Sequence, residues 1–317
     1  MDIKQLRAVV TVAEAGSVTR AAELLHLVQP AVTRQIRSLE KELGIALFER
    51  TGQGMRPTKA GAIMVDRARR ALNELERARA EVQPPPGQVT GIVAVGLLES
   101  TSDLLAEPLV AALGREHPGV VLQLITAYSG HLQQWLADGD LDLTLLYNLD
   151  STPAVNATPL VRERLWAVAP PEAGLRADVP VPFAEAALHP LVMPAAGHAL
   201  RGLIDAAATR ARTELSVAVQ TNSMRVQKQL VAAGHGWTIL PGLGIADDVE
   251  SGTISAAPLS EPDIWRSIVL ATPRYARTPP AVEVVARELV HLIGTAVAQG
   301  RWPSALAPGA GDPPADS

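Results

Sequence analysis

The 317-residue chain contains no cysteine, and only 3% of its residues are aromatic. The absence of cysteine excludes disulfides, thiolate metal sites and a cysteine nucleophile. The first residues, MDIKQLRAVV, contain no apolar run long enough to span a membrane, and they lack the basic start and long apolar stretch of a signal peptide. We therefore expect a cytoplasmic protein that makes no contact with membranes.

Catalytic and metal-binding motifs are also missing. The sequence has no GxSxG elbow, no Walker loop and no HExxH or HxH pair. We therefore expect no metal, no cofactor and no enzymatic activity. Among the histidines, only His131 is a candidate for ligand contact. The others are expected in turns or at the surface: His26, His117, His189, His198, His235 and His291.

The net charge of −5 conceals an uneven distribution. Residues 1–83 contain 14 Lys and Arg against 10 Asp and Glu, which gives +4, whereas the remainder carries 14 against 23, which gives −9. A basic head on an acidic body indicates that only the head meets a polyanion. Chance scatter of charge would give the same numbers, so the local sequence pattern has to decide.

Residues 1–58 have the pattern of short helices followed by a small hairpin. Ser17 is a good N-cap for a helix from Val18 to about His26. A third helix is expected from Gln29, with Pro30 in its first turn, to about Leu43 before Gly44. The stretch 48–57 holds two glycines and a proline, which is typical of a β-hairpin.

The third helix has two distinct faces. Its aliphatic residues recur at helical spacing and predict a buried side, whereas the opposite face is polar and partly cationic, which suits the major groove of DNA. Small residues, Ala21 and Ala22, stand where the preceding helix must approach it closely. The pattern predicts a winged helix-turn-helix, and a solvated cationic face is the alternative. The candidate DNA contacts are Ser17, Thr19, Arg20, Gln29, Pro30, Thr33, Arg34, Arg37, Lys41, Arg50 and Arg56.

A long helix is expected from about Thr58 to Val82, followed by a Pro-rich hinge that ends at residue 88. Its apolar residues are spaced 4, 3, 4, 3 and 4, which is a heptad seam. The helix would span roughly 37 Å. We expect the seam to pair with a second chain, and packing within the same chain is the alternative. The seam consists of Met64, Ala68, Ala71, Leu75, Ala78 and Val82.

From residue 89 onward, apolar strand-like segments alternate with helical ones. This alternation predicts a mostly parallel sheet covered by helices on both faces. The overall fold class is therefore α+β and multidomain, with residues 89–302 as a two-lobed α/β domain. The Pro-, Gly- and Ala-rich residues 303–317 are expected to be disordered.

The head closely resembles a known family. The runs AAELLH, QPAVTRQIRSLE and KELGIALFER, followed by RPTKAG at 56–61, are similar to the signature of the LysR-type transcriptional regulators. The family often has serine where Thr33 stands here, and the hydroxyl is retained. Residues 129–147 are more similar to the branch that contains nitrogen-assimilation regulators.

The resemblance implies a winged helix-turn-helix, a linker helix at 59–88 that pairs between subunits, and a periplasmic-binding-protein-like effector domain. Lobe one would comprise 89–161 and 268–300, and lobe two 162–267. Double-stranded promoter DNA and a second copy, as homodimer or homotetramer, would be partners, and RNA polymerase is a further candidate.

In this family the effector binds between the lobes, so polar residues after strands and at helix starts are its candidate contacts. Their set favours a small polar or anionic effector, although each residue is equally explained as a plain helix cap. A DNA-binding dimer without ligand, and an enzyme or transport-type binding protein, are the competing functions. The candidates are Ser100, Thr101, Ser102, Thr126, Ser129, His131, Tyr147, Asn148, Thr221, Asn222 and Ser223.

Overall fold

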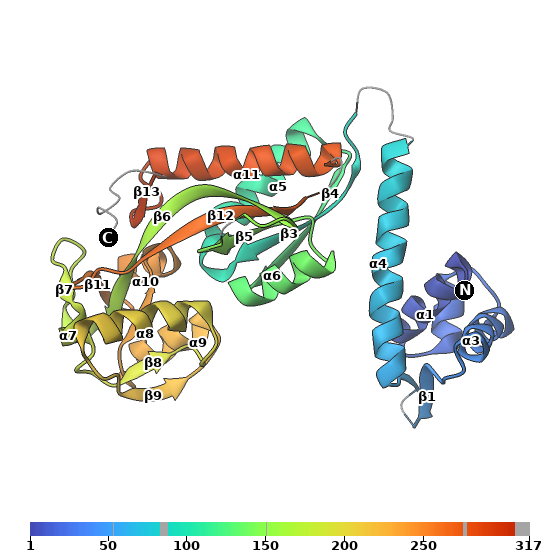
Figure 1. Ribbon diagram of the computed structural model, residues 1–317, viewed down its shortest axis with the longest axis horizontal. Coiled ribbons are helices and arrows are strands. Elements are labelled where there is room, and N and C mark those ends of the chain that lie inside the picture. The colour runs from blue at the N-terminus through green and yellow to red at the C-terminus, as the bar shows by residue number, and fades with distance from the viewer. Residues whose placement is uncertain (53, 83–87, 150, 275–277, 308–317) are drawn as a thin grey trace. The chain divides into compact units, whose positions relative to one another are not determined.

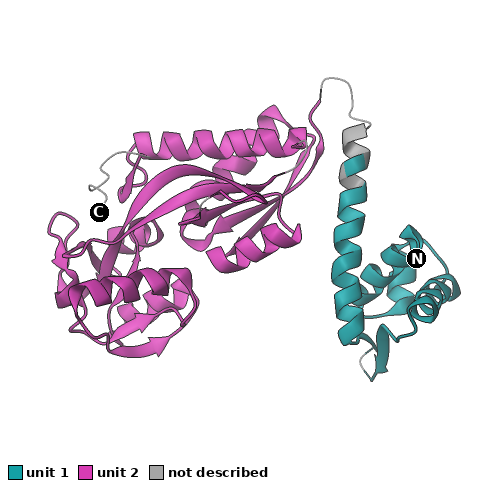
Figure 2. Ribbon diagram, in the orientation of Figure 1, with its two compact units in different colours: residues 1–87 teal, residues 88–317 magenta. Residues whose placement is uncertain are grey.

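A computed structural model describes residues 1–317 except 53, 83–87, 150, 275–277 and 308–317. The chain divides into two compact units, residues 1–87 and residues 88–317 (Figure 2). The long helix belongs to the first unit. It contacts the helices of residues 1–58, which are called the head from here on.

The first unit opens with three helices, α1 (Ile3–Ala15), α2 (Val18–Leu24) and α3 (Gln29–Leu43). Asp2 and Gln5 form a reciprocal capping box at the start of α1, and the Ser17 side chain accepts a hydrogen bond from the Arg20 backbone at the start of α2. Gly44 ends α3 in the left-handed conformation. The helices enclose a small aliphatic core that includes Val9, Ala21, Val32, Ile36 and Leu39.

The wing is the antiparallel hairpin of β1 (Phe48–Thr51) and β2 (Gly54–Pro57). The Glu40 carboxylate of α3 accepts hydrogen bonds from the backbone amides of Leu47 and Phe48, which fixes the hairpin against the helix. Gly54 adopts a φ of 129°, and a Cβ there would lie 2.4 Å from the Gly16 carbonyl oxygen. Only glycine fits this approach of the wing to the end of α1.

Helix α4 (Lys59–Val82) completes the first unit and runs along α1 (Figure 1). The Thr58 hydroxyl accepts a hydrogen bond from the Gly61 amide and so caps its first turn. Val65 and Ala68 are buried in the contact with the head, and Met64 packs against the same core. The first turns of α4 therefore belong structurally to the head.

Lobe one of the second unit is a sheet with helices on both faces. Its strand order is β4-β3-β5-β12-β6, with α5 and α11 on one face and α6 on the other (Figure 1). The strands are β3 (Gly91–Leu98), β4 (Val120–Ala127), β5 (Leu143–Tyr147), β6 (Val155–Ala169) and β12 (Trp265–Pro273). The helices are α5 (Ser102–Glu116), α6 (Ser129–Asp138) and α11 (Pro280–Ala298), and the 3₁₀ turn η1 (Glu99–Thr101) joins β3 to α5.

Lobe two is built on the second half of β6. Strands β10 (Thr238–Pro241) and β11 (Ser255–Ser260) pair with it, β11 also pairs with β7 (Val181–Pro182), and β8 (Leu191–Met193) pairs with β9 (Val217–Gln220). The helices are α7 (Phe183–Ala186), α8 (Ala199–Ala211), α9 (Met224–Ala232) and α10 (Ala246–Glu250). The 3₁₀ turns are η2 (Pro171–Ala173) and η3 (Gly242–Ile245).

Two long strands, β6 and β12, connect the lobes and pair with each other along their length (Figure 1). Their register shifts between Ile268 and Val269, opposite Val161 and Pro159. The irregularity lies next to the lobe boundaries expected from the sequence, which fall after residue 161 and before residue 268. Such a break in the ladder is where two paired strands bend most easily.

The expectation of a mostly parallel sheet is wrong. Strands β3, β4 and β5 are parallel, as are β8 and β9, but β12 is antiparallel to both β5 and β6, and β6 is antiparallel to β10 and β11. The reason is topological, because β6 and β12 run between the lobes in opposite directions. Strand–helix alternation in sequence does not report this reversal.

The predicted disordered tail at 303–317 also needs correction at its start. Residues Ala305–Leu306 form strand β13, which pairs antiparallel with Glu163 and Arg162 of β6. Trp302 and Ser304 are buried. The composition suggested a free tail, but Ser304 has a buried hydrogen-bond partner in β6 that the local sequence does not reveal. Residues 308–317 lie outside the described part of the chain, as does most of the predicted hinge at 83–88.

Candidate nucleic-acid interface and interlobe pocket

The outer face of α3 presents cations that are not neutralised. Arg34, Arg37 and Lys41 are exposed, and within the described part of the chain no carboxylate forms an ion pair with them. On the inner side of the same helix, Val32 and Ile36 are buried. The charges therefore face solvent in a fixed direction, as a helix that enters a DNA groove requires.

Grooves on the surface of the head bring most of the predicted DNA contacts together. One groove lies between the start of α2, α3 and the wing, and another follows the outer face of α3. The Thr33 hydroxyl donates to the Gln29 carbonyl at 3.1 Å, so Thr33 is held in place on this face. Predicted residues on the first groove are Ser17, Thr19, Gln29, Thr33, Arg37 and Arg50. Those on the second are Gln29, Pro30, Thr33, Arg34, Arg37 and Lys41.

Arg20 and Arg56, two further predicted contacts, do not line either groove. Both side chains are exposed, Arg20 in the first turn of α2 and Arg56 in the second strand of the wing. The predicted roles of Arg20 at the DNA backbone and of Arg56 at the adjacent strand or minor groove stay predictions.

The predicted heptad seam on α4 is divided. Ala68, only 2% exposed, and Met64 pack against the head of the same chain, which corrects their assignment to an interface between subunits. The physical reason is that α1 lies along the first turns of α4. Ala71 and Ala78 are exposed, and Leu75 is 45% exposed, so this part of the seam is open to a partner. The Val82 side chain lies outside the described residues.

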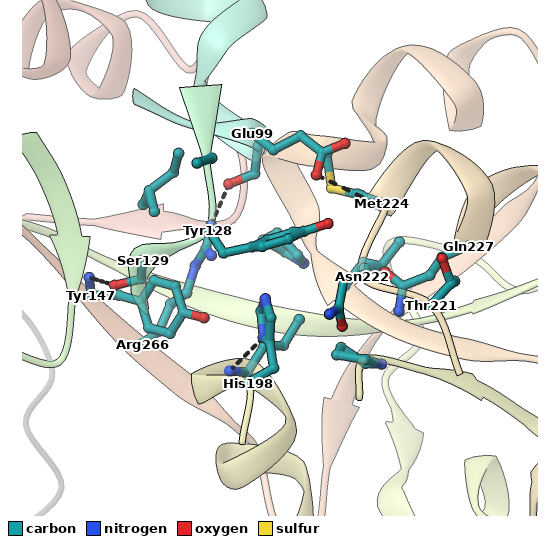
Figure 3. A pocket seen from close by; sticks show the side chains of 17 residues that line it. Glu99, Tyr128, Ser129, Tyr147, His198, Thr221, Asn222, Met224, Gln227 and Arg266 are labelled. Carbon is teal, nitrogen blue, oxygen red and sulfur yellow. Dashed lines mark hydrogen bonds between the residues drawn. The ribbon is translucent and has the colours of Figure 1, made fainter. Parts of the chain in front are cut away.

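A pocket lies between the two lobes of the second unit (Figure 3). It encloses about 450 Å³ between atoms, including the open space at its mouth. The ends of β3 and β4 and the start of α6 contribute one wall, and the starts of α8 and α9 contribute the other. Its polar and aromatic lining consists of Glu99, Ser100, Tyr128, Ser129, Tyr147, His198, Thr221, Asn222, Gln227 and Arg266, and its apolar lining includes Leu98, Leu200, Met224 and Leu240.

The base of the pocket holds an ion pair that belongs to a larger network. Glu163 and Arg266, adjacent on β6 and β12, are 0% and 4% exposed, and both Nε and Nη2 of Arg266 donate to Glu163 Oε2, at 2.9 and 2.6 Å. Arg266 Nη2 also donates to Ser100 Oγ at 2.7 Å, and its guanidinium lies 5.2 Å from the centroid of the Tyr147 ring. The positive charge of Arg266 is thus compensated before any ligand arrives.

The second oxygen of Glu163 collects three further donors. The Leu243 amide, Trp302 Nε1 and Ser304 Oγ donate to Oε1 at 3.1, 3.0 and 2.9 Å. These groups come from η3 in lobe two and from the C-terminal segment. A buried carboxylate with every acceptor position engaged fixes the elements that surround it.

An aromatic cluster forms the centre of the pocket wall. The rings of Tyr128 and His198 meet edge to face with centroids 4.7 Å apart, and His131 lies 5.9 Å from Tyr128. Burial lowers the pKa of His198, and the nearby His131 and Arg266 lower it further. Burial, and then the charge of Glu99, raise the pKa of Tyr128. His198 Nδ1 accepts a hydrogen bond from the Leu200 amide, which requires the neutral ring.

Glu99 and Gln227, which line the pocket, form few hydrogen bonds through their side chains. Glu99 Oε2 accepts a hydrogen bond from the Met224 amide at 3.4 Å, a long contact that crosses from lobe one to α9 in lobe two (Figure 3). Gln227 is 3% exposed, and its Nε2 has no hydrogen-bond partner among the described residues. Buried polar groups without partners are uncommon, and a bound molecule is one way to satisfy them.

The pocket contains some of the predicted effector contacts but not all. Ser100, Ser129, Tyr147, Thr221 and Asn222 line it. Thr101 and Ser102 donate instead to the carbonyls of Leu98 and Glu99, because the 3₁₀ turn directs them away from the pocket. The remaining predicted residues, outside the lining, are Thr126 on the exposed side of β4, His131, Asn148 in a turn bonded to Ser267, and Ser223, which caps α9.

Among the polar and aromatic lining residues, sequence reasoning missed five: Glu99, Tyr128, His198, Gln227 and Arg266. Tyr128 and His198 each stand directly before a helix, so their positions alone could have selected them. Arg266 and Gln227 reach the pocket only because distant elements pack together. Among the histidines, His198 rather than His131 lines the pocket.

Two features are absent from the described residues, a metal-binding cluster and a membrane-spanning helix. No group of three or more His, Asp or Glu side chains is arranged to hold a metal ion. None of the helices described combines the length and the apolar character needed to cross a membrane.

A winged helix-turn-helix with a free cationic face, together with a two-lobed domain around a pocket, defines a DNA-binding transcriptional regulator that carries an effector-binding domain. The chain belongs to the LysR family. The family described as "Bacterial regulatory helix-turn-helix protein, lysR family" matches residues 3–62, and the "LysR substrate binding domain" matches residues 86–293.

Characterised relatives are transcriptional regulators, in agreement with the expectation that the chain is not an enzyme. It is 29% identical to the HTH-type transcriptional regulator BbuR of Bordetella bronchiseptica over 96% of this chain and 93% of the relative. It is also 29% identical to the nitrogen assimilation regulatory protein nac of Klebsiella aerogenes, over 92% of this chain and 95% of the relative. The predicted similarity to nitrogen-assimilation regulators is thereby confirmed.

Solved structures share the fold at lower identity. A full-length OxyR variant from Pseudomonas aeruginosa has a TM-score of 0.66 with 24% identity, covering 92% of this chain and 94% of that one. Full-length CbnR in complex with its target DNA has a TM-score of 0.71 with 21% identity, covering 92% of this chain and all of that one. These likenesses establish the fold: an N-terminal helix-turn-helix and a C-terminal two-lobed domain.

Proposed function

We propose that this regulator binds double-stranded promoter DNA through α3 and the wing, as a homodimer or homotetramer, and that a small polar effector in the interlobe pocket controls it. The observation that carries the proposal is the pairing of an unneutralised cationic face on α3 with a partly polar pocket between two lobes. Because the proposed partner is promoter DNA, we propose that the protein acts in the cytoplasm. The proposal requires no cofactor besides the effector.

Residue positions on α3 divide the DNA contacts by role. Gln29, Pro30, Thr33 and Arg34 lie near the helix start, where side chains reach base edges. Arg37 and Lys41 lie further along and are assigned to phosphates, with Arg50 and Arg56 of the wing assigned to the adjacent strand or minor groove. Ser17, Thr19 and Arg20 at the start of α2 are assigned to the DNA backbone.

The exposed apolar residues of α4 support self-association. Ala71, Leu75 and Ala78 continue the stripe of Met64 and Ala68 along α4, beyond the first turns that pack against the head, and they are exposed. Pairing this stripe with its copy would remove apolar surface from water. RNA polymerase is proposed as a further partner through the regulator's position at a promoter.

Three measurements test the parts of the proposal separately. A gel-shift titration with a promoter fragment at controlled salt tests DNA binding, and sedimentation tests the oligomer. Thermal unfolding against a metabolite library tests the effector, because a ligand of the native state raises the melting temperature by mass action. Failure to shift promoter DNA at low ionic strength would overturn the regulator function, and the absence of any stabilising metabolite would favour a regulator without ligand.

A further inference from the structure

Resting on the proposed function, we infer that the effector carries a cationic ammonium group, bound between the Glu99 carboxylate and the ring of Tyr128. The sequence alone favoured a polar or anionic effector. The charges that line the pocket favour a cationic molecule instead.

The charge balance of the pocket is negative. Its lining includes one acid, Glu99, and one permanent cation, Arg266. Two hydrogen bonds to the fully buried Glu163 compensate Arg266, so its charge is not available to neutralise a second anion. Glu99 forms no ion pair among the described residues. A carboxylate ligand would be repelled by Glu99, with no free cation nearby to offset the repulsion. An ammonium ligand would neutralise the negative charge of Glu99.

Glu99 also has unused hydrogen-bonding capacity. An ionised carboxylate accepts about four hydrogen bonds, yet Glu99 accepts one, from the Met224 amide at 3.4 Å. The side chain is partly exposed and lines the pocket beside Tyr128 (Figure 3). An ammonium group supplies up to three donors and matches this deficit.

The aromatic cluster adds a second feature that favours a cation. Tyr128 and His198 present ring surfaces to the pocket and hold each other edge to face at 4.7 Å. An ammonium group near an aromatic face is attracted by the negative charge of the ring surface, and the attraction grows where water is excluded. Figure 3 shows the side chains of Glu99 and Tyr128 next to each other in the lining.

Gln227 indicates what stands at the other end of the ligand. Gln227 lines the pocket, and its buried Nε2 has no hydrogen-bond partner among the described residues. A donor in this position calls for an oxygen acceptor on the ligand. The effector class is therefore a small amine with an apolar or aromatic skeleton and a neutral oxygen acceptor. Since Glu99 belongs to lobe one and Gln227 to α9 of lobe two, such a molecule would bridge the lobes.

Matched ligands that differ only in charge test the inference. Tyramine, tyrosol and para-hydroxyphenylacetate share one skeleton and carry an amine, an alcohol and an acid, and 4-aminobutanol, 1,4-butanediol and 4-hydroxybutyrate form an aliphatic set that keeps a neutral oxygen acceptor. Each is titrated against the full-length protein at pH 7, with thermal unfolding as the readout. We expect an amine to raise the melting temperature saturably and its alcohol and acid counterparts to have weaker effects.

Variants assign the charge to Glu99. Glu99→Gln is expected to weaken amine binding by about tenfold or more, while Glu107→Gln, on the exposed face of α5, leaves it unchanged. Stronger stabilisation by the acids, no stabilisation by either amine, or equal amine affinity in Glu99→Gln overturns the inference. Gel shifts with the same preparations measure DNA binding independently, so loss of the amine inference would leave the proposed DNA-binding function intact.

Discussion

Arg34 and Arg37 are both exposed on α3 but stand at different distances from its start. We predict that Arg34→Ala lowers the affinity for a specific duplex by about 1–3 kcal/mol and relaxes base preference, because Arg34 is placed to reach base edges. The measurement is a titration at fixed ionic strength against specific and scrambled duplexes.

Arg37→Ala is the matched control on the same face. It is expected to weaken binding to both duplexes alike and to reduce the slope of log affinity against log salt by about 1, as loss of one phosphate contact does. Arg34→Ala could leave the ratio of affinities for the specific and scrambled duplexes unchanged, or Arg37→Ala could weaken binding to the specific duplex alone. Either result would contradict the assignment of Arg34 to bases and Arg37 to phosphate.

His198 should make the stability of the two-lobed domain depend on pH. Burial lowers its pKa below the ordinary value near 6.5, and its Nδ1 accepts a hydrogen bond that a proton would abolish. Because the unfolded chain binds the proton more readily, stability is full above about pH 6.5 and falls as the pH drops toward the lowered pKa. We predict that His198→Asn, which can still cap α8, reduces this loss.

Melting temperatures of the native protein and the variant at pH 7.5 and 5.5 check this prediction. His235→Asn, at an exposed position before β10, is the control and should follow the native protein. An equal loss of stability in His198→Asn and the native protein would exclude His198 as the cause.

The buried and exposed faces of α3 could be predicted because they depend on one helix alone. A period of 3.6 residues assigns Val32 inward and Arg34 outward without knowledge of the rest of the fold. The pocket is different, since Glu99, Gln227 and Arg266 come together from three distant elements. Helix-cap signals at Ser100–Ser102 also misled the prediction, because Thr101 and Ser102 bond to their own turn.

At the scale of elements, α4 carries an apolar stripe that the head leaves uncovered. We predict that Leu75→Arg weakens dimerisation by about 2 kcal/mol or more, because the seam would have to bury an unpaired charge. Sedimentation over a concentration series measures the effect. Asn73→Arg adds the same charge two residues away, on the opposite side of the helix, and should leave the dimer intact. A native dissociation constant in Leu75→Arg would exclude the stripe as the interface.

Helix limits were predictable where caps are local, as at Ser17, Pro30 and Gly44. The sheet was not, because strand direction and pairing depend on residues far apart in sequence. Strand β6 runs from Val155 to Ala169, and its first half contains polar residues and Pro159, which obscure the strand pattern in the sequence. Strand β13 was missed for a related reason, because its partner in β6 lies some 140 residues away in sequence.

At the scale of the whole effector-binding domain, Glu163 connects elements that must move together. Through Arg266 it reaches Ser100 of lobe one, and through Oε1 it holds η3 of lobe two and the C-terminal segment. A change in the angle between the lobes must preserve or break these bonds. The network therefore contributes to the free energy of any change in the lobe arrangement, and an effector that drives such a change must supply interactions that differ between the arrangements.

The two oxygens of Glu163 have separate partners, which allows a decisive prediction. Glu163→Gln retains an Oε1 acceptor for Leu243, Trp302 and Ser304 but places an amide against Arg266, and it should cost about 3–5 kcal/mol of unfolding free energy by leaving a buried charge unpaired. Adding Arg266→Met removes that charge, so the double variant should recover at least half of the loss.

Urea unfolding of the native protein, both single variants and the double variant measures the coupling, with the exposed Glu185→Gln as a control expected to match the native protein. Additive losses in the double variant would mean that the ion pair between β6 and β12 does not govern the stability of the connection between the lobes. Recovery would mean that the three Oε1 bonds alone suffice to hold the lobes and the C-terminal segment, while the ion pair fixes Arg266 beneath the pocket. In that case the double variant should fold yet bind the effector more weakly, because Ser100 and Tyr147 would lose their guanidinium neighbour.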